Sequence, residues 1–364
     1  MNELKVCNDT SAFEVPAVVD RQGKLTDDCV RQALTMIDTH GLVFLTNLLS
    51  ADEANVGLEL MRETIDDPDR SRSAFASETD NRYLRRDFCS LPSTPPVTRF
   101  AAMLCQRLEG VLSEYCGRSR SLLEVATFTS YAGSSHQYVH RDPVGVISLF
   151  AAVEDVSNQQ GGTVFVPGTH MYGGAGNKHG GQAYALMELF RIKANYRIFA
   201  YNLKKLWRMR NGNEPPLAPG EFIDRVFSSK WDQHQPNLLR FVLGKNSQFS
   251  IRMLGPRTLW KLYRHRKTLN NLFQLVQTAP QKGTIIIYRS DLLHAGPDNR
   301  SPSPRRFFGM SIARDIIEPK YWHDGYSPHP TLTACPMSLG DLLDFTPPAE
   351  PPSLPKRRLS SLVD

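Results

Sequence analysis

The apolar positions in the first third of the chain alternate between helical and strand-like spacing. Between Thr26, which can cap a helix, and Gly41, which can end one, four apolar residues recur at helical intervals: Val30, Ala33, Leu34 and Ile37. Residues 42–45 then form a short apolar run that is typical of a strand. The sequence Ser-Ala-Asp-Glu at 50–53 is a capping box that opens a second helix, and residues 99–116 predict a third.

From about residue 122 the pattern changes to that of β-strands. Short apolar runs punctuated by Gly and Pro occupy residues 146–153, 163–166, 284–288 and 307–313. Several short strands with this punctuation are typical of a sandwich or jelly roll. The Ser-, Asp- and Arg-rich segment 70–95 between the two parts is predicted as loop.

A long insertion, roughly residues 171–280, separates the two groups of strands. It begins with a glycine-rich loop at 173–181 and continues as an amphipathic stretch at 183–210. Over residues 191–270 there are 17 Lys and Arg against 4 Asp and Glu, a net charge of +13, whereas the whole chain carries +6. The basic character is therefore local to the insertion.

The charge of the insertion has several interpretations. A solvated face of a helical subdomain is the simplest, and attraction of an anionic substrate (a CoA thioester, a carboxylate or an acidic carrier protein) is the second. Contact with lipid head groups is the third, because aromatic residues such as Tyr196, Tyr201 and Trp207 lie among the charges. Nucleic acid is not expected as a partner, since no recognised binding module is visible.

Composition excludes several classes of protein. With 41% hydrophobic and 22% charged residues, the chain is globular and not disordered. No stretch approaches 18 uninterrupted apolar residues, so we expect no membrane span, and residues 1–10 lack the pattern of a secretory signal. The six cysteines form no C-x-x-C pair, which favours a reducing, cytoplasmic location. The Pro-rich end, residues 346–364, is predicted as a disordered tail.

One triplet could carry metal chemistry. His140 and Asp142 lie two residues apart, so on an extended segment their side chains point to the same side and can share one metal ion. His294, which follows the strand-like run at 284–288, is the best third ligand and would complete a 2-His-1-carboxylate triad, which leaves open positions on Fe(II). Eleven residues later, Arg305 could bind a carboxylate through two parallel hydrogen bonds.

These residues lie in segments that resemble the phytanoyl-CoA dioxygenase family. Residues 137–142, Gln-Tyr-Val-His-Arg-Asp, look like its Q-x-x-H-x-D segment, and residues 161–170 are similar to its strand that ends in P-G-[ST]-H. Residues 283–305 resemble its distal-histidine segment, and residues 41–50 its N-terminal strand and helix entry. The matches occur in the family's order and cover roughly 25–65, 98–170 and 283–315.

The resemblance implies an Fe(II)- and 2-oxoglutarate-dependent oxygenase on a double-stranded β-helix. His140, Asp142 and His294 would bind iron, and Arg305 would bind the distal carboxylate of 2-oxoglutarate. The motif positions imply that two further residues line the cosubstrate pocket, Thr129 and Phe150. Many relatives carry a serine two residues after the distal histidine, where this chain has a glycine, Gly296.

Three regions are expected from the resemblance and the composition. Residues 1–120 would pack on a catalytic core at 121–345, which the insertion at 171–280 interrupts, and the tail follows at 346–364. The insertion would serve as a lid over the substrate. The adjacent arginines 305 and 306 face opposite sides of a strand, so only one can point inward, and the motif favours Arg305. His170, although it belongs to the P-G-[ST]-H motif, is not expected to bind iron.

The expected reaction uses O2 to hydroxylate or desaturate an unactivated C–H bond of a small organic substrate, with succinate and CO2 as co-products. Halogenating relatives lack the carboxylate that Asp142 supplies, so its presence favours hydroxylation, desaturation or ring chemistry. Two alternatives remain open at this stage. One is a non-catalytic, cupin-like protein that binds metal or ligand, and the other is an oxygenase that acts on nucleic acid or on a carrier-bound substrate.

Overall fold

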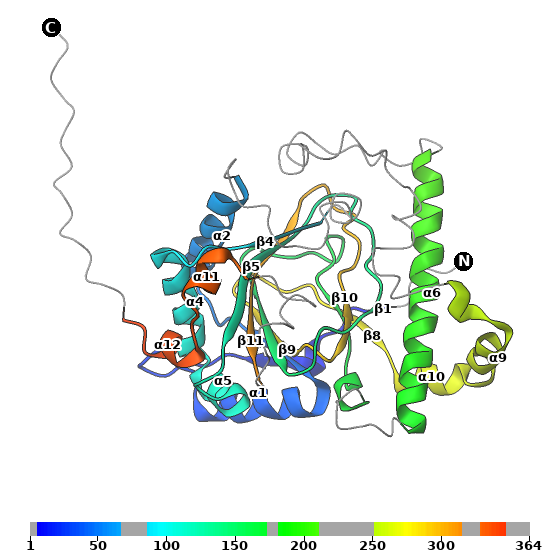
Figure 1. Cartoon of the computed structure of the whole chain (residues 1–364), viewed down its shortest axis with the longest axis horizontal. Helices are drawn as coiled ribbons and strands as arrows, with labels where there is room; N and C mark the ends of the chain where they lie inside the picture. Colours follow the sequence, from blue (N-terminus) through cyan, green and yellow to red (C-terminus); the bar gives the residue numbers. More distant parts are fainter. Residues whose placement is uncertain (1–5, 67–85, 173–180, 211–250, 315–327, 347–364) are drawn as a thin grey trace, which may run out of the picture.

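Two β-sheets lie at the centre of the molecule, with helices on both sides (Figure 1). The structure is a computed structural model, and it describes the chain at residues 6–66, 86–172, 181–210, 251–314 and 328–346. Most of the predicted glycine-rich loop at 173–181, the middle of the insertion at 211–250 and the tail from residue 347 lie outside the described residues.

The N-terminal helices follow the predicted pattern closely. They are α1 (Asp27–His40), α2 (Ala51–Asp66), α4 (Pro95–Arg107) and α5 (Glu109–Cys116). Gly41 ends α1 in the left-handed conformation, whereas the Thr26 side chain makes no capping hydrogen bond. The capping box is confirmed, because Ser50 N donates to Glu53 Oε2 at 2.8 Å and Glu53 N donates to Ser50 Oγ at 3.3 Å. The predicted third helix is two helices, separated at Leu108.

The large sheet has seven strands in the order β2-β3-β9-β6-β11-β5-β4. All its strand pairs are antiparallel except β2 with β3. The strands are β2 (Glu14–Pro16), β3 (Leu42–Thr46), β4 (Arg86–Ser90), β5 (Leu122–Ser130), β6 (Val146–Ala152), β9 (Ile285–Arg289) and β11 (Arg305–Ala313). The predicted loop at 70–95 is therefore wrong at its end, because β4 pairs with β5 along five residues.

The small sheet has the order β1-β8-β7-β10. Its strands are β1 (Val6–Cys7), β7 (Val164–Val166), β8 (Leu275–Gln277) and β10 (Leu293–Ala295). Since β8 pairs with both β1 and β7, it belongs to the sheet, and the inserted helices end before Leu275. The short helices η1 (Ser11–Phe13), η2 (Thr169–Tyr172), α11 (Pro330–Ala334) and α12 (Leu339–Leu343) complete the described core.

The two sheets face one another across a layer of aromatic side chains. Phe165 of the small sheet packs against Phe44 and Tyr288 of the large sheet, with ring centroids 6.3 and 5.1 Å apart. The opposite face of the large sheet packs on α1, α2, α4 and α5 in the main hydrophobic cluster. The alternation of strand residues between these two faces explains the nearly continuous apolar runs in the sequence. The predicted fold, a mainly β, cupin-like arrangement with added helices, is confirmed, although the sheets do not close into a barrel.

The described part of the insertion packs against the small sheet. It consists of α6 (Gln182–Arg210), η3 (Ile251–Leu254), α9 (Pro256–Arg264) and α10 (Arg266–Leu272). Met187 and Ile198 of α6 are fully buried in a second hydrophobic cluster with residues of β7, β8 and β10. Helix α6 is therefore an integral part of the core. Among the described helices, none combines the length and the hydropathy that a bilayer crossing requires.

Candidate metal and anion site

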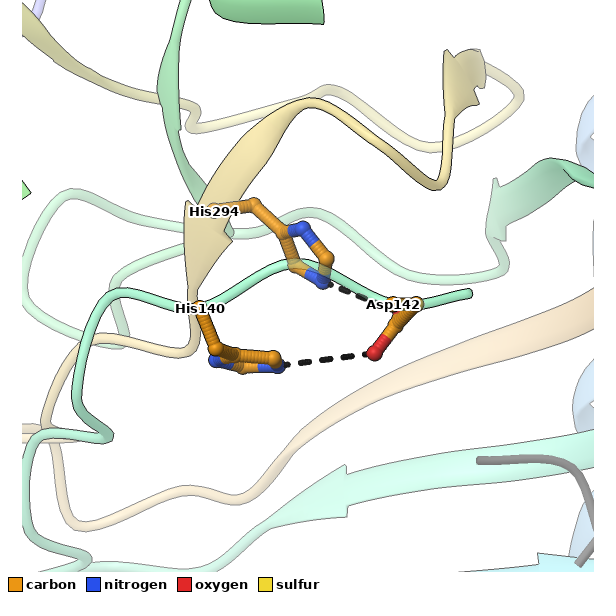
Figure 2. A group of neighbouring side chains, drawn as sticks. All are labelled: His140, Asp142 and His294. Atoms are coloured by element: carbon orange, nitrogen blue, oxygen red, sulfur yellow. Dashed lines mark ion pairs between the residues drawn. The ribbon is translucent and has the colours of Figure 1, made fainter. Parts of the chain in front are cut away.

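The three predicted ligands converge at one point between the sheets. The donor atoms of His140, Asp142 and His294 all lie within 4.8 Å of one another. Asp142 Oδ2 is 3.2 Å from His294 Nε2, and Asp142 Oδ1 is 3.9 Å from His140 Nε2 (Figure 2). All three side chains point toward a common centre, although they come from two separate segments of the chain.

Backbone hydrogen bonds hold the two ligand-bearing segments together. His140 and His294 form an isolated antiparallel bridge, in which each backbone N–H donates to the other's carbonyl oxygen at 2.9 Å. Asp142 N donates to Ser290 O at 3.0 Å, which continues the pairing along the segment before β10. This register places His140 and His294, which are 154 positions apart in the chain, on one face of a two-stranded ribbon.

The outer ring nitrogens of both histidines are already engaged. His140 Nδ1 lies 2.8 Å from Tyr138 O, and His294 Nδ1 lies 2.9 Å from Leu292 O. A carbonyl oxygen accepts only, so each Nδ1 carries the proton and each Nε2 keeps its lone pair for a cation. Histidine ligands of metal sites commonly have such a partner on the second nitrogen, which fixes the orientation of the ring.

The ionisation of the three groups suits a bound cation. Burial raises the pKa of Asp142, but the adjacent His294 outweighs burial, so the pKa of this carboxyl lies below its ordinary value. Burial and the charge of His294 lower the pKa of His140. Burial also lowers the pKa of His294, yet the Asp142 carboxylate reverses the sign and raises it. The carboxylate therefore attracts a positive charge to this centre, where a proton and a metal ion compete.

The donor set fits a divalent transition metal. Two imidazole nitrogens and one carboxylate oxygen on one side of an ion form the facial triad of non-haem iron sites, with the remaining positions free. The 3.2 Å separation of the Asp142 and His294 donors is close to the edge of an octahedron with bonds of about 2.1 Å. The His140 and Asp142 donors lie further apart, at 3.9 Å.

Two buried arginines lie side by side on the inner face of the large sheet. Arg305 pairs in register with Ser130 of β5, and Ser130 pairs with Arg86 of β4, so the three residues form one cross-strand row. Arg86 Nη1 and Arg305 Nη2 both donate to Ser130 Oγ, at 2.6 and 2.7 Å. Arg305 Nη1 also donates to the carbonyl oxygens of Gly161 and Gly162.

The two guanidinium groups form a strongly positive interior. Only 1% of Arg86 and 4% of Arg305 is exposed, and within the described residues neither has a carboxylate within ion-pair distance. Burial lowers the pKa of Arg86 to about 10, and burial together with the charge of Arg86 lowers that of Arg305, while Asp298 opposes both shifts. The Nε atoms of both arginines lack a hydrogen-bond partner. Since buried charges require compensation, this pair predicts an anion nearby.

The glycine at position 296 has a steric role. Arg86 Nη2 donates to the carbonyl oxygens of Gly296 and Pro297, at 2.9 and 2.5 Å. A Cβ atom at residue 296 would lie 2.4 Å from Arg86 Nη1 and 2.7 Å from Gln137 Oε1. Gln137 Oε1 also accepts a hydrogen bond from Gly296 N at 2.8 Å, which gives the glutamine of the Q-x-x-H-x-D segment a structural role. The Arg86 side chain thus occupies the space that a serine would need.

The two other predicted pocket residues lie on opposite faces of the large sheet. Phe150 lies on the inner face, where its ring stacks on Phe307 at 5.6 Å and packs against Tyr288 at 5.3 Å. Thr129 pairs with Arg306 and therefore lies on the opposite face from Arg305. The neighbouring residue Ser130, and not Thr129, therefore shares the face of Arg305 and contacts its guanidinium. Arg306 pairs with Glu154 at 3.3 Å on the outer face.

A second polar row crosses the inner face closer to Asp142. Tyr288, Ser148, Ser311 and Glu124 are partners in register on four neighbouring strands, and all four are buried. Ser311 Oγ donates to Glu124 Oε1 at 2.9 Å and lies 3.3 Å from Ser148 Oγ. Burial, with the charge of Asp142, raises the pKa of Tyr288 well above its ordinary value, so its phenol stays protonated beside His294.

Helix α6 supplies polar side chains to the segment that leads to His140. Asn202 Nδ2 donates to His136 O at 3.1 Å, and Lys205 Nζ donates to the carbonyl oxygens of Gly133 and Ser134, both at 3.0 Å. Asn195, seven residues before Asn202 on the same face, bonds the backbone of Val139. The inserted helix therefore satisfies the backbone of an extended segment that has no neighbouring strand along this edge.

The remaining histidines near the site are not ligands in this arrangement. His170 Nε2 lies 3.0 Å from the carbonyl oxygen of Asp38, and His170 does not belong to the cluster of possible metal ligands. His136 is buried, and its Nδ1 lies 3.2 Å from Gln137 O.

Three residues of the site escaped the sequence analysis: Arg86, Ser130 and Asn195. Arg86 lies in a segment whose composition indicated a loop, and Ser130 is one position from the residue that the motif indicated. Asn195 lies in the insertion, which the segments that resemble the family do not include. Gly296 could have indicated a further residue at the site. A glycine where relatives carry serine leaves space for another side chain, and in the structure Arg86 fills that space.

Several solved structures are similar to this chain. SnoK, an alpha-ketoglutarate-dependent carbocyclase from nogalamycin biosynthesis, is 12% identical over 81% of this chain and 87% of its own, with a TM-score of 0.44. The epimerase SnoN of the same biosynthesis is 12% identical over 79% and 84%, with a TM-score of 0.45. HygX from Streptomyces hygroscopicus, with nickel and 2-oxoglutarate bound, is 14% identical over 80% and 87%, with a TM-score of 0.40. No family model and no curated protein sequence matches the chain.

Proposed function

We propose that this protein is an Fe(II)- and 2-oxoglutarate-dependent dioxygenase. It would hydroxylate or desaturate an unactivated C–H bond of a small organic substrate, with succinate and CO2 as co-products. The observation that carries the proposal is the combination of two sites between the sheets. One is a cluster of two histidines and a carboxylate, and the other is a buried arginine pair on the inner face of the large sheet. A cupin that only binds a metal ion has no need for the arginine pair. A dicarboxylate cosubstrate that chelates the metal at one end needs the metal cluster and also a cationic group for its other carboxylate.

Each residue has a role in this assignment. His140, Asp142 and His294 would hold Fe(II), and their outer partners keep both Nε2 atoms free for it. The metal, O2 and 2-oxoglutarate together would supply the oxidant for C–H cleavage. Tyr288 keeps a protonated phenol, and its ring packs against the His294 imidazole with centroids 5.3 Å apart.

The arginine pair would bind the distal carboxylate of 2-oxoglutarate. Arg305 is the residue that the family resemblance assigns to this task, and Arg86 adds a second guanidinium on the other side of Ser130. In a buried site, charge-assisted hydrogen bonds to a carboxylate are strong because water does not compete. The bound anion would also compensate two charges that otherwise oppose one another.

The substrate is proposed by class alone. It would be a small molecule of the acyl, terpenoid or amino-acid-derived kind, anionic or lipid-like, and the stacked rings of Phe150 and Phe307 on the inner face supply apolar surface for it. We further propose that the basic insertion covers the substrate, and that the protein acts in the cytoplasm without binding nucleic acid. One experiment distinguishes this enzyme from the alternative, a binding protein without turnover.

The test compares metal binding with turnover. Anaerobic addition of Fe(II) and then 2-oxoglutarate should produce a visible charge-transfer band, and admission of O2 should yield succinate even without substrate. Asp142→Ala should lose both signals, while Arg305→Ala should require more 2-oxoglutarate for the band. Metal binding without succinate over prolonged incubation with candidate substrates would favour the cupin-like binding protein.

A further inference from the structure

Helix α9 presents large apolar side chains to solvent. The exposed fractions of Leu259, Trp260 and Tyr263 are 52%, 60% and 60%, and no residue of the helix is buried. These residues are spaced i, i+1 and i+4, so they lie on one side of the helix. On the other side Leu262 is partly buried and packs against the second hydrophobic cluster. The helix is thus anchored by one face and exposes an aromatic face.

The same surface is strongly basic. Arg257, Lys261 and Arg264 belong to α9, Arg266 and Lys267 begin α10, and residues 256–272 contain no Asp or Glu. The Arg266 guanidinium lies 4.3 Å from the centre of the Tyr263 ring, which in turn lies 6.1 Å from the Trp260 ring. Cationic and aromatic groups therefore share one continuous patch, which we name the α9 face.

The α9 face lies far from the candidate metal site in the architecture. Helices α9 and α10 lie on the outer side of α6, at the edge of the molecule, whereas the metal cluster lies between the two sheets (Figure 1). Helix α6 separates the two regions and contributes its own buried face to the core. The exposed aromatic residues of α9 are therefore not explained by binding of the metal or the cosubstrate.

We propose that the α9 face docks the protein on an anionic lipid bilayer. Trp and Tyr side chains favour the boundary between water and lipid, because the ring is apolar while its polar atom can still form hydrogen bonds. Lysines and arginines around them are attracted to anionic head groups, each by a factor of roughly five in affinity. The absence of acidic residues from 256–272 removes the repulsion that would oppose this contact.

A lipid surface fits the α9 face better than other polyanions do. Nucleic acid or an acidic protein would use the cations, but neither accounts for Leu259 and Trp260 side by side in water. A bilayer offers an apolar phase for these side chains and negative charge for the cations at the same time. The contact is peripheral, since the helix has nine residues and cannot span a bilayer.

The test measures co-sedimentation of the full chain with vesicles. We expect binding to phosphatidylcholine vesicles that contain phosphatidylserine, weak binding to phosphatidylcholine alone, and loss of binding as the salt concentration rises. Trp260→Ser/Tyr263→Ser and, separately, Lys261→Gln/Arg264→Gln should each lower the partition coefficient on the order of 10-fold. All substituted side chains are exposed, so the thermal unfolding midpoint should stay unchanged in both variants.

A matched control removes one exposed apolar group and one cation elsewhere. Val18→Ser/Arg21→Gln changes two exposed residues in the segment before α1 and should leave vesicle binding intact. Equal binding by the wild type and both α9 variants would overturn the proposal, as would failure of the wild type to bind phosphatidylserine vesicles. Binding to heparin or DNA without vesicle binding would assign the α9 face to a soluble polyanion instead.

Discussion

The carboxamide of Asn195 bonds both backbone polar groups of Val139. Asn195 Oδ1 accepts from Val139 N at 2.7 Å, and Asn195 Nδ2 donates to Val139 O at 3.0 Å. Val139 directly precedes His140, and Tyr138 before it provides the carbonyl oxygen at His140 Nδ1. Through one side chain, the inserted helix α6 therefore fixes both the backbone of a proposed ligand and the acceptor that orients its ring.

Replacing Asn195 with leucine should weaken metal binding. The variant Asn195→Leu keeps a similar volume but leaves the buried N–H and C=O of Val139 without partners, at a cost of roughly 1–3 kcal/mol each. We expect the affinity for Co(II) or anaerobic Fe(II) to fall about 10-fold, as for other residues that support a ligand. A metal titration followed by absorption spectroscopy measures this effect.

The matched control for this experiment is Asn202→Leu. Asn202 donates one hydrogen bond to His136 O, four residues before His140, so its loss should lower stability with little effect on metal affinity. Urea unfolding of both variants without metal separates the two effects. If both variants lose the same metal affinity in proportion to their lost stability, Asn195 has no specific positioning role.

The contact between Gly296 and Arg86 predicts a coupled pair of substitutions. In Gly296→Ala the new Cβ would lie 2.4 Å from Arg86 Nη1, and the buried guanidinium is held by several carbonyl oxygens, so it cannot move freely. We expect the affinity for 2-oxoglutarate to fall on the order of 10-fold in Gly296→Ala and in Arg86→Ala. Calorimetric titration of the metal-loaded protein with 2-oxoglutarate under anaerobic conditions measures this affinity.

A double-mutant cycle decides whether the two effects share one cause. If the glycine matters because of Arg86, Gly296→Ala should add little further loss in an Arg86→Ala background. Additive losses in the double variant would show instead that the alanine disturbs the site through Gln137, the other atom group within reach of its Cβ.

Substitution of the two adjacent arginines of β11 should have unequal effects. Arg305 is buried and donates to Ser130 Oγ, whereas Arg306 forms a partly exposed pair with Glu154. Arg305→Ala should raise the 2-oxoglutarate concentration for half-maximal succinate formation on the order of 100-fold. Arg306→Ala should leave it within about 2-fold, because such surface pairs contribute at most about 1 kcal/mol. The opposite ranking would contradict the register of β11.

Acid should destabilise the fold through His136. Burial lowers the pKa of this histidine from 6.5 to about 4, with Asp298 opposing the shift. Between these values the unfolded chain binds a proton that the folded chain does not, so the free energy of unfolding decreases as the pH falls from 6.5 toward 4. From pH 7 to pH 5 the contribution of this one group is about 2 kcal/mol.

Urea unfolding of the wild type and of His136→Gln across this range measures the contribution. The variant should lose less stability than the wild type between pH 7 and pH 5, while the two slopes should coincide above pH 7. Equal slopes at acid pH would mean that His136 titrates normally in the folded protein and is not desolvated.

The local elements followed from the sequence because their signals are local. Helix α1 ends at the glycine that the spacing indicated, and the capping box at Ser50 forms as predicted. Strands β6, β7, β9 and β11 occur within two residues of the apolar runs, since a buried strand needs apolar side chains on both faces. The predicted loop at 70–95 was wrong at its end, because pairing of β4 with the distant strand β5 decides that segment. In the same way, pairing with β7 decides that β8 belongs to the small sheet.

The candidate ligands could be named from the sequence, but their convergence could not. The spacing of His140 and Asp142 places two donors on one side of a short segment, a property of the backbone alone. The approach of His294 depends on a bridge between segments some 150 residues apart, and the choice between Thr129 and Ser130 depends on the register of β5 against β11. A shift of one residue reverses the faces of a strand, so only the folded chain decides which side chains meet.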